Sequence, residues 1–384
     1  MLNAENLKAE TITKREDIER IITFWRDNAY ALDSDPDFFL KILDIRENII
    51  SPFLIYITEN NKPISLLVAR LERKKLSAKI GYFKLLSVGV RSINVNYGGF
   101  IGVDTPTTRN IMIKTLLKNL EDGVADLVFF HMLHEDSHLF QDLDSCNIKS
   151  WRIQKSLPSM HYEMKCPESP SDVLEKKSSK IRKRLNYEIR KVERSLVNPK
   201  LTVDSSGEKV DDLMDELELV TSKTYQRRLG VGFVKNAEWR AILEVGFEKK
   251  WLDVWKLLEC GKCISYIIGF TYSGRHLIYA KAFDPDYANL SVGKYHQINV
   301  LKELAGRNNC KLVDYGFGDA AYKKQFSTNE WRERNISISS STIFSLFVHL
   351  YIKLALSMDL ILRTILAKMG LTDRIKKFLR KNHF

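Results

Sequence analysis

The chain has 384 residues, 44% of them hydrophobic, which argues against a disordered chain and favours two domains over one. The formal charge of +12 and the pI near 9.2 favour an anionic partner, such as a nucleic acid, a cofactor phosphate or an acidic membrane surface. The N-terminus is polar and acidic, so no secretory signal peptide is expected. Five widely spread cysteines indicate reduced thiols in a cytosolic protein.

The first half predicts a hairpin, a strand, a helix and a strand, in that order. Residues 53–71 form two apolar runs around the turn cluster 60–63. Residues 94–103 are a Gly-containing strand, residues 108–120 have helical spacing, and residues 125–132 are a buried strand.

The second half repeats this order. Its expected members are strands at 251–258, 264–272 and 276–283, a helix at 293–304 and a strand at 311–315. The Cys-x-x-Cys run between the first two strands lacks a second pair or a suitably spaced His, so a hairpin turn is preferred over a metal or redox site. The pattern indicates either two copies of one α/β unit or two common α/β arrangements.

A Pro/Ser-rich break at 166–171 predicts a domain boundary near residue 165. The following segment, 178–194, is expected to be a helix with an apolar stripe and basic residues over the rest of its surface. This surface is either an ordinary solvated face or a site for phosphates or an acidic acceptor.

The most specific stretch is 277–326. Its elements are a strand with Tyr279, an Asp284-Pro285 turn, the helix entry Ser291-Val292-Gly293, a strand ending in Asp-x-Gly-x-Gly from Asp314, and Tyr322-Lys323. This pattern resembles the CelD/BcsL-like, or FemAB-like, branch of the GNAT superfamily. The match covers most of 165–335, including the basic helix, whereas the first half resembles the family's degenerate first copy only loosely.

The resemblance implies an α/β (α+β) fold with tandem GNAT-like domains, each a mixed twisted sheet flanked by helices. The expected domains are 1–165, a degenerate copy, and 166–340, the acyl-CoA-binding copy. Residues 341–384 form an amphipathic basic helical tail, whose apolar part is interrupted by charges before it reaches the length of a membrane span. Two readings of the tail stay open: peripheral attachment to an anionic leaflet, or packing on the domain or on a second subunit.

The expected acyl-CoA site begins at the helix entry. Ser291, Val292, Gly293 and Lys294 place free N–H groups, the positive end of the helix dipole and a cation beside the pyrophosphate. Ser291 is also a possible N-cap, a role compatible with phosphate binding. This entry has fewer Gly and Arg residues than the general GNAT pyrophosphate loop.

Acyl transfer from a thioester needs oxyanion stabilisation, a proton for the leaving thiolate and a base. The resemblance implies that backbone N–H groups near Lys281, Ala282 and Phe283 meet the oxyanion, where such donors are worth about 10² to 10³ in rate. It also implies that Tyr322 protonates the thiolate; the alternative is an ordinary core tyrosine.

Asp314 is the leading candidate base, and it alternatively holds the turn that follows its strand. His296 is the second candidate; it lies on a helix and is alternatively an ordinary packed histidine. Lys323 is expected to contact a phosphate or an acidic acceptor, and Tyr225, Arg228 and Tyr279 to line the acceptor pocket. No metal is expected, since the three histidines at 131, 134 and 138 suit a loop and a helix start.

The sequence therefore predicts a GNAT-type transferase that moves an acyl group, with acetyl first, from acyl-CoA to an amine or hydroxyl of a sugar or cell-envelope precursor. The sugar part comes from the resemblance alone. The alternatives are a FemAB-like transferase that uses aminoacyl-tRNA, and a non-catalytic scaffold at a membrane polysaccharide assembly. The expected location is the cytoplasm, including the inner face of the membrane.

Overall fold

The computed structural model describes residues 6–80, 83–146, 148–224, 227 and 230–368. The chain divides into two compact units: unit 1 comprises Met1–Ile21, Glu47–Ser156 and Arg334–Phe384, and unit 2 comprises Ile22–Arg46 and Leu157–Glu333. These units are not the contiguous stretches 1–165 and 166–340. A segment from the first half joins unit 2, and the chain returns to unit 1 after residue 333.

Unit 1 is built on a mixed sheet. It runs β1-β2-β3-β4-β5-β13, and β6 also pairs β13. The strands are β1 (Leu7–Ile12), β2 (Ile49–Glu59), β3 (Lys62–Ile80), β4 (Phe83–Gly102), β5 (Leu127–His134), β6 (Ile153–Lys155) and the later part of β13 (Asn329–Ser339). The strands pair antiparallel up to β4, whereas β4 and β5 are parallel. Helices α3 (Pro106–Glu121) and α4 (His138–Ser145) bury their apolar side chains against this sheet.

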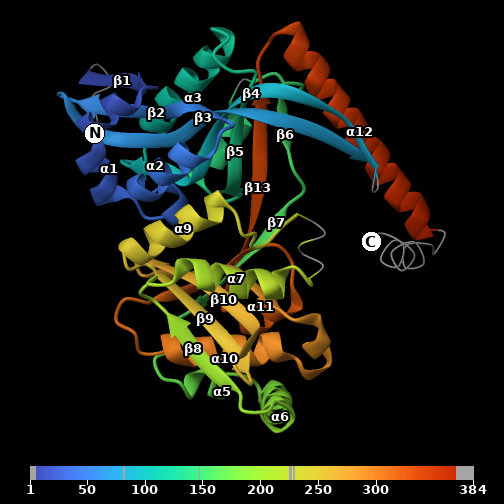
Figure 1. Cartoon of the computed structure of the whole chain (residues 1–384). Helices are drawn as coiled ribbons and strands as arrows, with labels where there is room; N and C mark the ends of the chain where they lie inside the picture. Colours follow the sequence, from blue (N-terminus) through green and yellow to red (C-terminus); the bar gives the residue numbers. More distant parts are fainter. Residues whose placement is uncertain (1–5, 81–82, 147, 225–226, 228–229, 369–384) are drawn as a thin grey trace. The chain divides into compact units, whose positions relative to one another are not determined.

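Unit 2 repeats the plan around β8 (Lys200–Asp204), β9 (Leu252–Glu259), β10 (Lys262–Tyr272), β11 (Arg275–Phe283), β12 (Leu312–Phe317) and β7 (Ser159–Lys165). Alternating side chains of β10 face opposite sides: Ile267 packs with α6 (Ser179–Ser195) and α10 (Val292–Leu304), and Tyr266 bonds Thr221 of α7 (Val210–Thr221). In the part of the unit that the structure describes, the other α-helices are α1 (Ile22–Asn28), α2 (Pro36–Ile45), α5 (Asp172–Glu175), α9 (Ala237–Glu248) and α11 (Ala321–Phe326) (Figure 1).

The predicted elements are present in both units, and the shared order of hairpin, strand, helix and parallel strand confirms the predicted tandem α/β fold. The Cys-x-x-Cys run is a hairpin turn, as predicted, because Glu259 pairs with Lys262 and the two residues between them have positive φ. Two strands are longer than predicted. β3 ends at Ile80 and β4 begins at Phe83, and the two pair along their length as one long hairpin.

Helix α12 (Ile343–Lys368) packs one face along this hairpin in unit 1 (Figure 1). Val348 joins a cluster with Val90 and Leu127, and the Tyr351 hydroxyl donates to the Leu86 carbonyl at 2.9 Å. The opposite face exposes large apolar side chains, namely Ile343, Phe347, Leu350, Leu354, Ile361 and Ile365. Within the described chain it is the one helix whose length and composition, over Ile343–Leu362, suffice to cross a membrane.

Candidate active site

The centre of unit 2 is a place where two parallel strands separate. β11 and β12 pair only through Arg275–Leu277 and Leu312–Asp314. β11 continues to Phe283 and stays paired with β10 on its other side. In the described chain, the edge of β11 that faces β12 therefore lacks a strand partner from residue 278 onward, a stretch that includes the expected oxyanion donors 281–283.

A β-bulge turns the side chains of β11 at this point. Ile268 of β10 pairs with Ala280 and the next residue pairs with Ile278, so the register shifts by one residue at Tyr279. Tyr279 packs against the rings of Trp239 and Phe270, at centroid distances of 5.6 and 5.2 Å. This places Tyr279 against the helix α9, whereas the next odd residue, Lys281, faces α10.

The start of α10 offers free donors. Ser291 has a left-handed φ of 61°, and its side chain makes no capping hydrogen bond, so an N-cap role is not observed. Its carbonyl accepts from the N–H groups of Lys294 and Tyr295, but in the described residues no acceptor meets the N–H of Val292 or Gly293. Free N–H groups at a helix N-terminus suit an anion such as a phosphate.

The other residues of this helix entry are packed or paired. A Cβ at Gly293 would lie 2.9 Å from the Phe283 ring, so glycine lets that ring lie against the helix. The side chain of Val292 is buried with Val192 and Leu257. Lys294 donates to Glu188 of α6 at 2.6 Å, so its charge is neutralised by a carboxylate.

Lys281 lies between α10 and α11. Its Nζ donates to Gln297 Oε1 at 2.6 Å and lies 3.1 Å from the centroid of the Tyr322 ring. Burial, together with the nearby positive charge of Lys323, holds the pKa of Lys281 well below its usual range. Tyr322 itself is half-buried against the core of unit 2.

Lys323 forms hydrogen bonds with the loop that follows β12. Its Nζ donates to the carbonyls of Phe317 at 2.7 Å and Gly316 at 3.3 Å. Burial lowers the pKa of Lys323 to about 8, against the opposing effect of Asp314 and Asp319. The side chain thus fixes the Gly-x-Gly turn.

Asp314 belongs to a buried ionic network. Its Oδ1 bonds His161 Nε2 at 2.7 Å and accepts from the Gly316 N–H at 2.7 Å, and its Oδ2 lies 3.2 Å from Arg275 Nη1. Burial raises the pKa of Asp314, but the bonds from His161, Gly316 and Arg275 outweigh burial and lower it. This geometry favours the second of its two predicted roles, holding the turn.

The same histidine has a second carboxylate partner. His161 Nδ1 lies 3.0 Å from Glu333 Oε2, and its ring stacks on Trp331 at 4.4 Å. Burial lowers the pKa of His161, yet the bonds with Asp314 and Glu333 outweigh it and raise that pKa to about 9. His161 and Glu333 were not predicted as site residues, because they lie on β7 and β13, outside the stretch 277–326 that carries the motif.

His296 is fully buried, and its Nδ1 lies 2.9 Å from Ser265 Oγ. Burial, with the positive charge of Lys281, lowers its pKa to about 3. A histidine in this environment stays neutral and packs between α10 and β10. Tyr225 and Arg228, expected in the acceptor pocket, lie outside the described residues.

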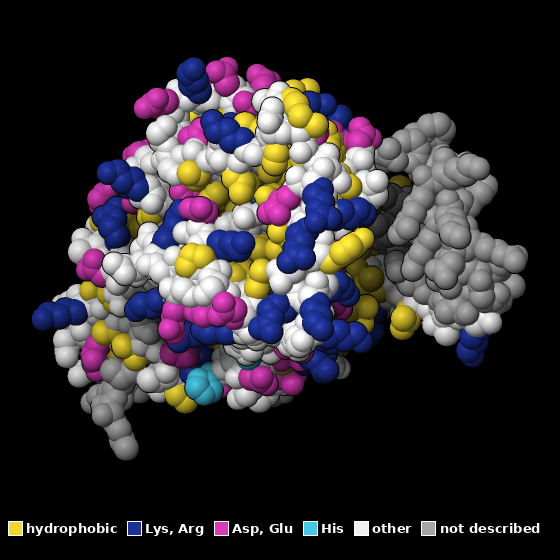
Figure 2. Space-filling view, turned by 90° about the horizontal axis from the view of Figure 1, so that it is seen from below, with side chains coloured by type: hydrophobic (Ala, Val, Ile, Leu, Met, Phe, Trp, Pro, Cys, Tyr) yellow, Lys and Arg dark blue, Asp and Glu magenta, His cyan; other side chains and the backbone are white. Residues whose placement is uncertain are grey.

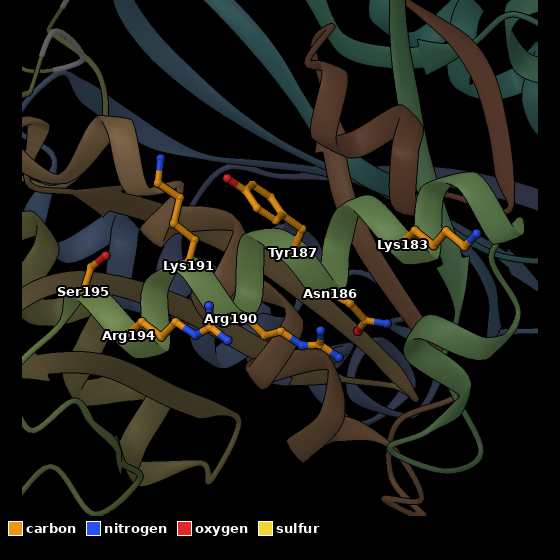
Figure 3. Close-up of a pocket in the computed structure, with 7 residues that line it drawn as sticks. All are labelled: Lys183, Asn186, Tyr187, Arg190, Lys191, Arg194 and Ser195. Atoms are coloured by element: carbon orange, nitrogen blue, oxygen red, sulfur yellow. The ribbon is translucent and has the colours of Figure 1, made fainter.

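The basic helix α6 forms an open hollow of about 440 Å³ on its outer side. Figure 2, a view onto the side where α6 lies, shows Lys and Arg side chains gathered on that face. The lining residues in Figure 3 all come from this helix: Lys183, Asn186, Tyr187, Arg190, Lys191, Arg194 and Ser195. The helix is anchored through Leu185 and Val192, which are buried, so its basic side chains are directed outward.

Comparison with known proteins identifies the domain. Residues 179–324 match the family model described as an acetyltransferase (GNAT) domain. No curated protein matches the chain.

Three solved structures have the same fold. FemX aligns with a TM-score of 0.56 and 10% identity, over 85% of this chain and 96% of that chain. The C-terminal domain of an Agrobacterium fabrum protein named as a lysylphosphatidylglycerol synthetase aligns with a TM-score of 0.50 and 12% identity, over 87% and 94%. A tandem GNAT protein from the clavulanic acid biosynthesis pathway aligns with a TM-score of 0.50 and 7% identity, over 88% and 99%.

Identities this low show the fold alone. The family match adds the type of domain, and that domain contains the separated strands and the free helix start described above. Residues 179–324 thus form a GNAT-type acetyltransferase domain, and the chain has a FemAB-like fold.

Proposed function

We propose that the second copy, residues 166–340, transfers an acyl group, with acetyl the first choice, from acyl-CoA to an amine or hydroxyl of a sugar or cell-envelope precursor. The observation that carries this proposal is the separation of β11 from β12 beside the free N-terminus of α10. The N–H groups of Val292 and Gly293 suit the pyrophosphate, and the unpaired edge of β11 suits an extended chain that hydrogen-bonds like a strand.

The reacting carbonyl would then lie beside residues 281–283, whose backbone N–H groups stabilise the oxyanion. Tyr322 supplies the proton to the thiolate. Lys323 fixes the turn after β12 and adds positive charge near the bound phosphates or an acidic acceptor.

An envelope acceptor for polysaccharide biosynthesis is supported by two features. The fold resembles that of FemX and of a domain named for a lysylphosphatidylglycerol synthetase. The exposed apolar face of α12 suits a cytoplasmic protein held peripherally at an anionic membrane surface, where lipid-linked acceptors are found.

A second candidate is transfer from aminoacyl-tRNA. The fold likeness to FemX and the basic hollow on α6 favour it, because guanidinium and ammonium groups bind nucleic acid phosphates. In this reading α6 holds the RNA backbone, and the same separated strands receive the aminoacyl end.

Acetyl-CoA binding tests the proposal directly. We expect calorimetry to show binding by the wild type and at least tenfold weaker binding by Gly293→Asp, which puts a side chain and a negative charge among the free N–H groups. Gly89→Asp is the matched control, because Gly89 is exposed on β4 with nothing within 4 Å of an added Cβ. Equal affinity in wild type and Gly293→Asp would place the cofactor elsewhere.

The acceptor requires a separate screen. Labelled acetyl-CoA and labelled aminoacyl-tRNA are each offered with a panel of amino sugars and envelope precursors. Label transfer only from the tRNA would replace the first candidate by the second, and transfer from neither donor would favour the scaffold.

A further inference from the structure

We propose that the side chain of Lys281 is the base of the reaction, taking the proton from the acceptor's amine or hydroxyl. This inference rests on the proposed function, and it gives Lys281 a role beyond its backbone N–H. It is needed because neither group considered as a base is placed for that role: Asp314 bonds His161 and Arg275, and His296 is fully buried and bonds Ser265 of β10.

The position of Lys281 supports this role. Its Cα lies on the part of β11 that pairs with β10 but not with β12, two residues beyond the bulge at Tyr279, and its side chain turns toward α10 and α11. Nζ contacts the neutral amide oxygen of Gln297 and the face of the Tyr322 ring. The amine is therefore held beside the residue proposed to protonate the leaving group.

The charge environment of Lys281 differs from that of three other lysines in unit 2. Lys223, Lys256 and Lys294 each contact a carboxylate, respectively Asp284, Glu216 and Glu188. No carboxylate contacts Lys281 in the described part of the chain. A desolvated lysine without a counter-charge loses the stabilisation of its ammonium form, so the pKa of Lys281 falls well below its usual range.

The proton transfers balance. The acceptor atom bonds to the thioester carbonyl carbon as its proton passes to the Lys281 lone pair. The C–S bond breaks, and the Tyr322 hydroxyl gives its proton to the thiolate. The Lys281 ammonium then returns a proton to the Tyr322 oxygen, directly or through water, so the net change is one proton moved from the acceptor to the CoA thiol.

The first test measures the amine itself and does not need turnover. The protein is labelled with trace acetic anhydride between pH 5 and pH 11, with free Nα-acetyl-lysine as internal standard, and mass spectrometry follows the peptide that contains Lys281. We expect its labelling to rise at a pH well below that of the standard, and saturating CoA to protect it. A Lys281 profile that follows the standard would overturn the proposal.

The second test compares variants by the release of CoA thiol from acetyl-CoA, with glucosamine or water as acceptor. Lys281→Met should lower turnover by about 10² to 10⁴ with little change in acetyl-CoA affinity, and the acidic limb of its pH–rate profile should disappear. Lys281→Arg keeps a positive charge and should not rescue turnover, since guanidinium does not deprotonate. Lys256→Met, at a lysine paired with Glu216, is the control.

These outcomes separate the two proposals. A wild type that fails to bind acetyl-CoA contradicts the proposed function, while the labelling profile still decides the state of the Lys281 amine. A wild type that binds and turns over, with Lys281→Met or Lys281→Arg equally active, removes Lys281 from the mechanism.

Discussion

Single side chains in unit 2 show two ways of burying a charge. His161 bridges two carboxylates, and at neutral pH each charge has an opposite partner. Lys281 has only an amide oxygen and an aromatic face, so its charge is disfavoured. The first arrangement stabilises a fixed protonation state, whereas the second prepares a group to change it.

The two ion pairs of His161 predict that its replacement lowers the free energy of unfolding. His161→Gln leaves Asp314 and Glu333 buried without their shared cation, which costs about 3–5 kcal/mol in unfolding free energy. Urea unfolding at pH 7 measures this loss. His138→Gln is the control, because the His138 side chain is 69% exposed. A change below 1 kcal/mol for His161→Gln would contradict a charged bridge.

The pH dependence has a definite sign. The pKa of His161 is raised to about 9 in the folded chain from an ordinary value of 6.5, so its stabilisation is fully present below pH 6.5 and is lost as the pH rises through 9. The pKa of Asp314 is lowered, so its contribution is lost only on the acid side, below its ordinary value of 3.8. We expect the His161→Gln variant to lack the alkaline loss.

The proposed role of Tyr322 as the proton donor predicts that removal of its hydroxyl lowers turnover. Tyr322→Phe keeps the ring on which the Lys281 amine lies but removes the proton donor, so turnover should fall by about 10² or more while acetyl-CoA affinity changes little. Release of CoA thiol under conditions where chemistry limits the rate measures this effect. Wild-type turnover in the variant would leave Tyr322 as a packing residue.

At the level of elements, local signals predicted most of unit 2. The turn at Cys260-Gly261 and the alternating apolar runs beside it suffice to place the β9–β10 hairpin, because a two-residue turn fixes the register. β13 was missed because Asn329–Ser339 begins with charged residues, whose burial depends on partners far away in the chain. The sequence of β13 alone contains no sign that Glu333 meets His161.

In the candidate site, too, local features could be predicted from the sequence and long-range contacts could not. The helix entry at 291–294 and the strand at 279–283 were predictable, since a motif of neighbouring residues defines them. The pairing of Lys294 with Glu188, the bulge at Tyr279 and the contact of Lys281 with Gln297 were not, because each depends on how separate elements pack. The positions of these elements were thus easier to predict than the surroundings of their side chains.

For the whole molecule, the open question is what the exposed face of α12 contacts. The helix packs on the β3–β4 hairpin, and Ala355 is the last of its described side chains that is buried. The 13 residues from 356 to 368 extend about 20 Å at 1.5 Å per residue, less than the roughly 30 Å of a bilayer core. Five basic residues and one acidic residue follow in the sequence at 372–384. This combination favours a helix that lies in the interface of an anionic leaflet over one that crosses it.

Removal of residues 341–384 should therefore release the protein from vesicles. We expect the full chain to co-sediment with vesicles of anionic lipid and to be released by added salt, because the basic tail supplies part of the affinity. The double variant Leu350→Glu, Leu354→Glu tests the apolar part without exposing the hairpin, since both side chains are more than half exposed on the face opposite the packed one. It should stay folded and soluble and lose vesicle binding. A different outcome would contradict this role: the variant binds vesicles like the wild type, and the wild type sediments as a dimer that the variant does not form. The exposed face of α12 would then be an interface between two copies of the chain. In that case the truncated protein should become insoluble or aggregate, because the hairpin loses the helix that covers it.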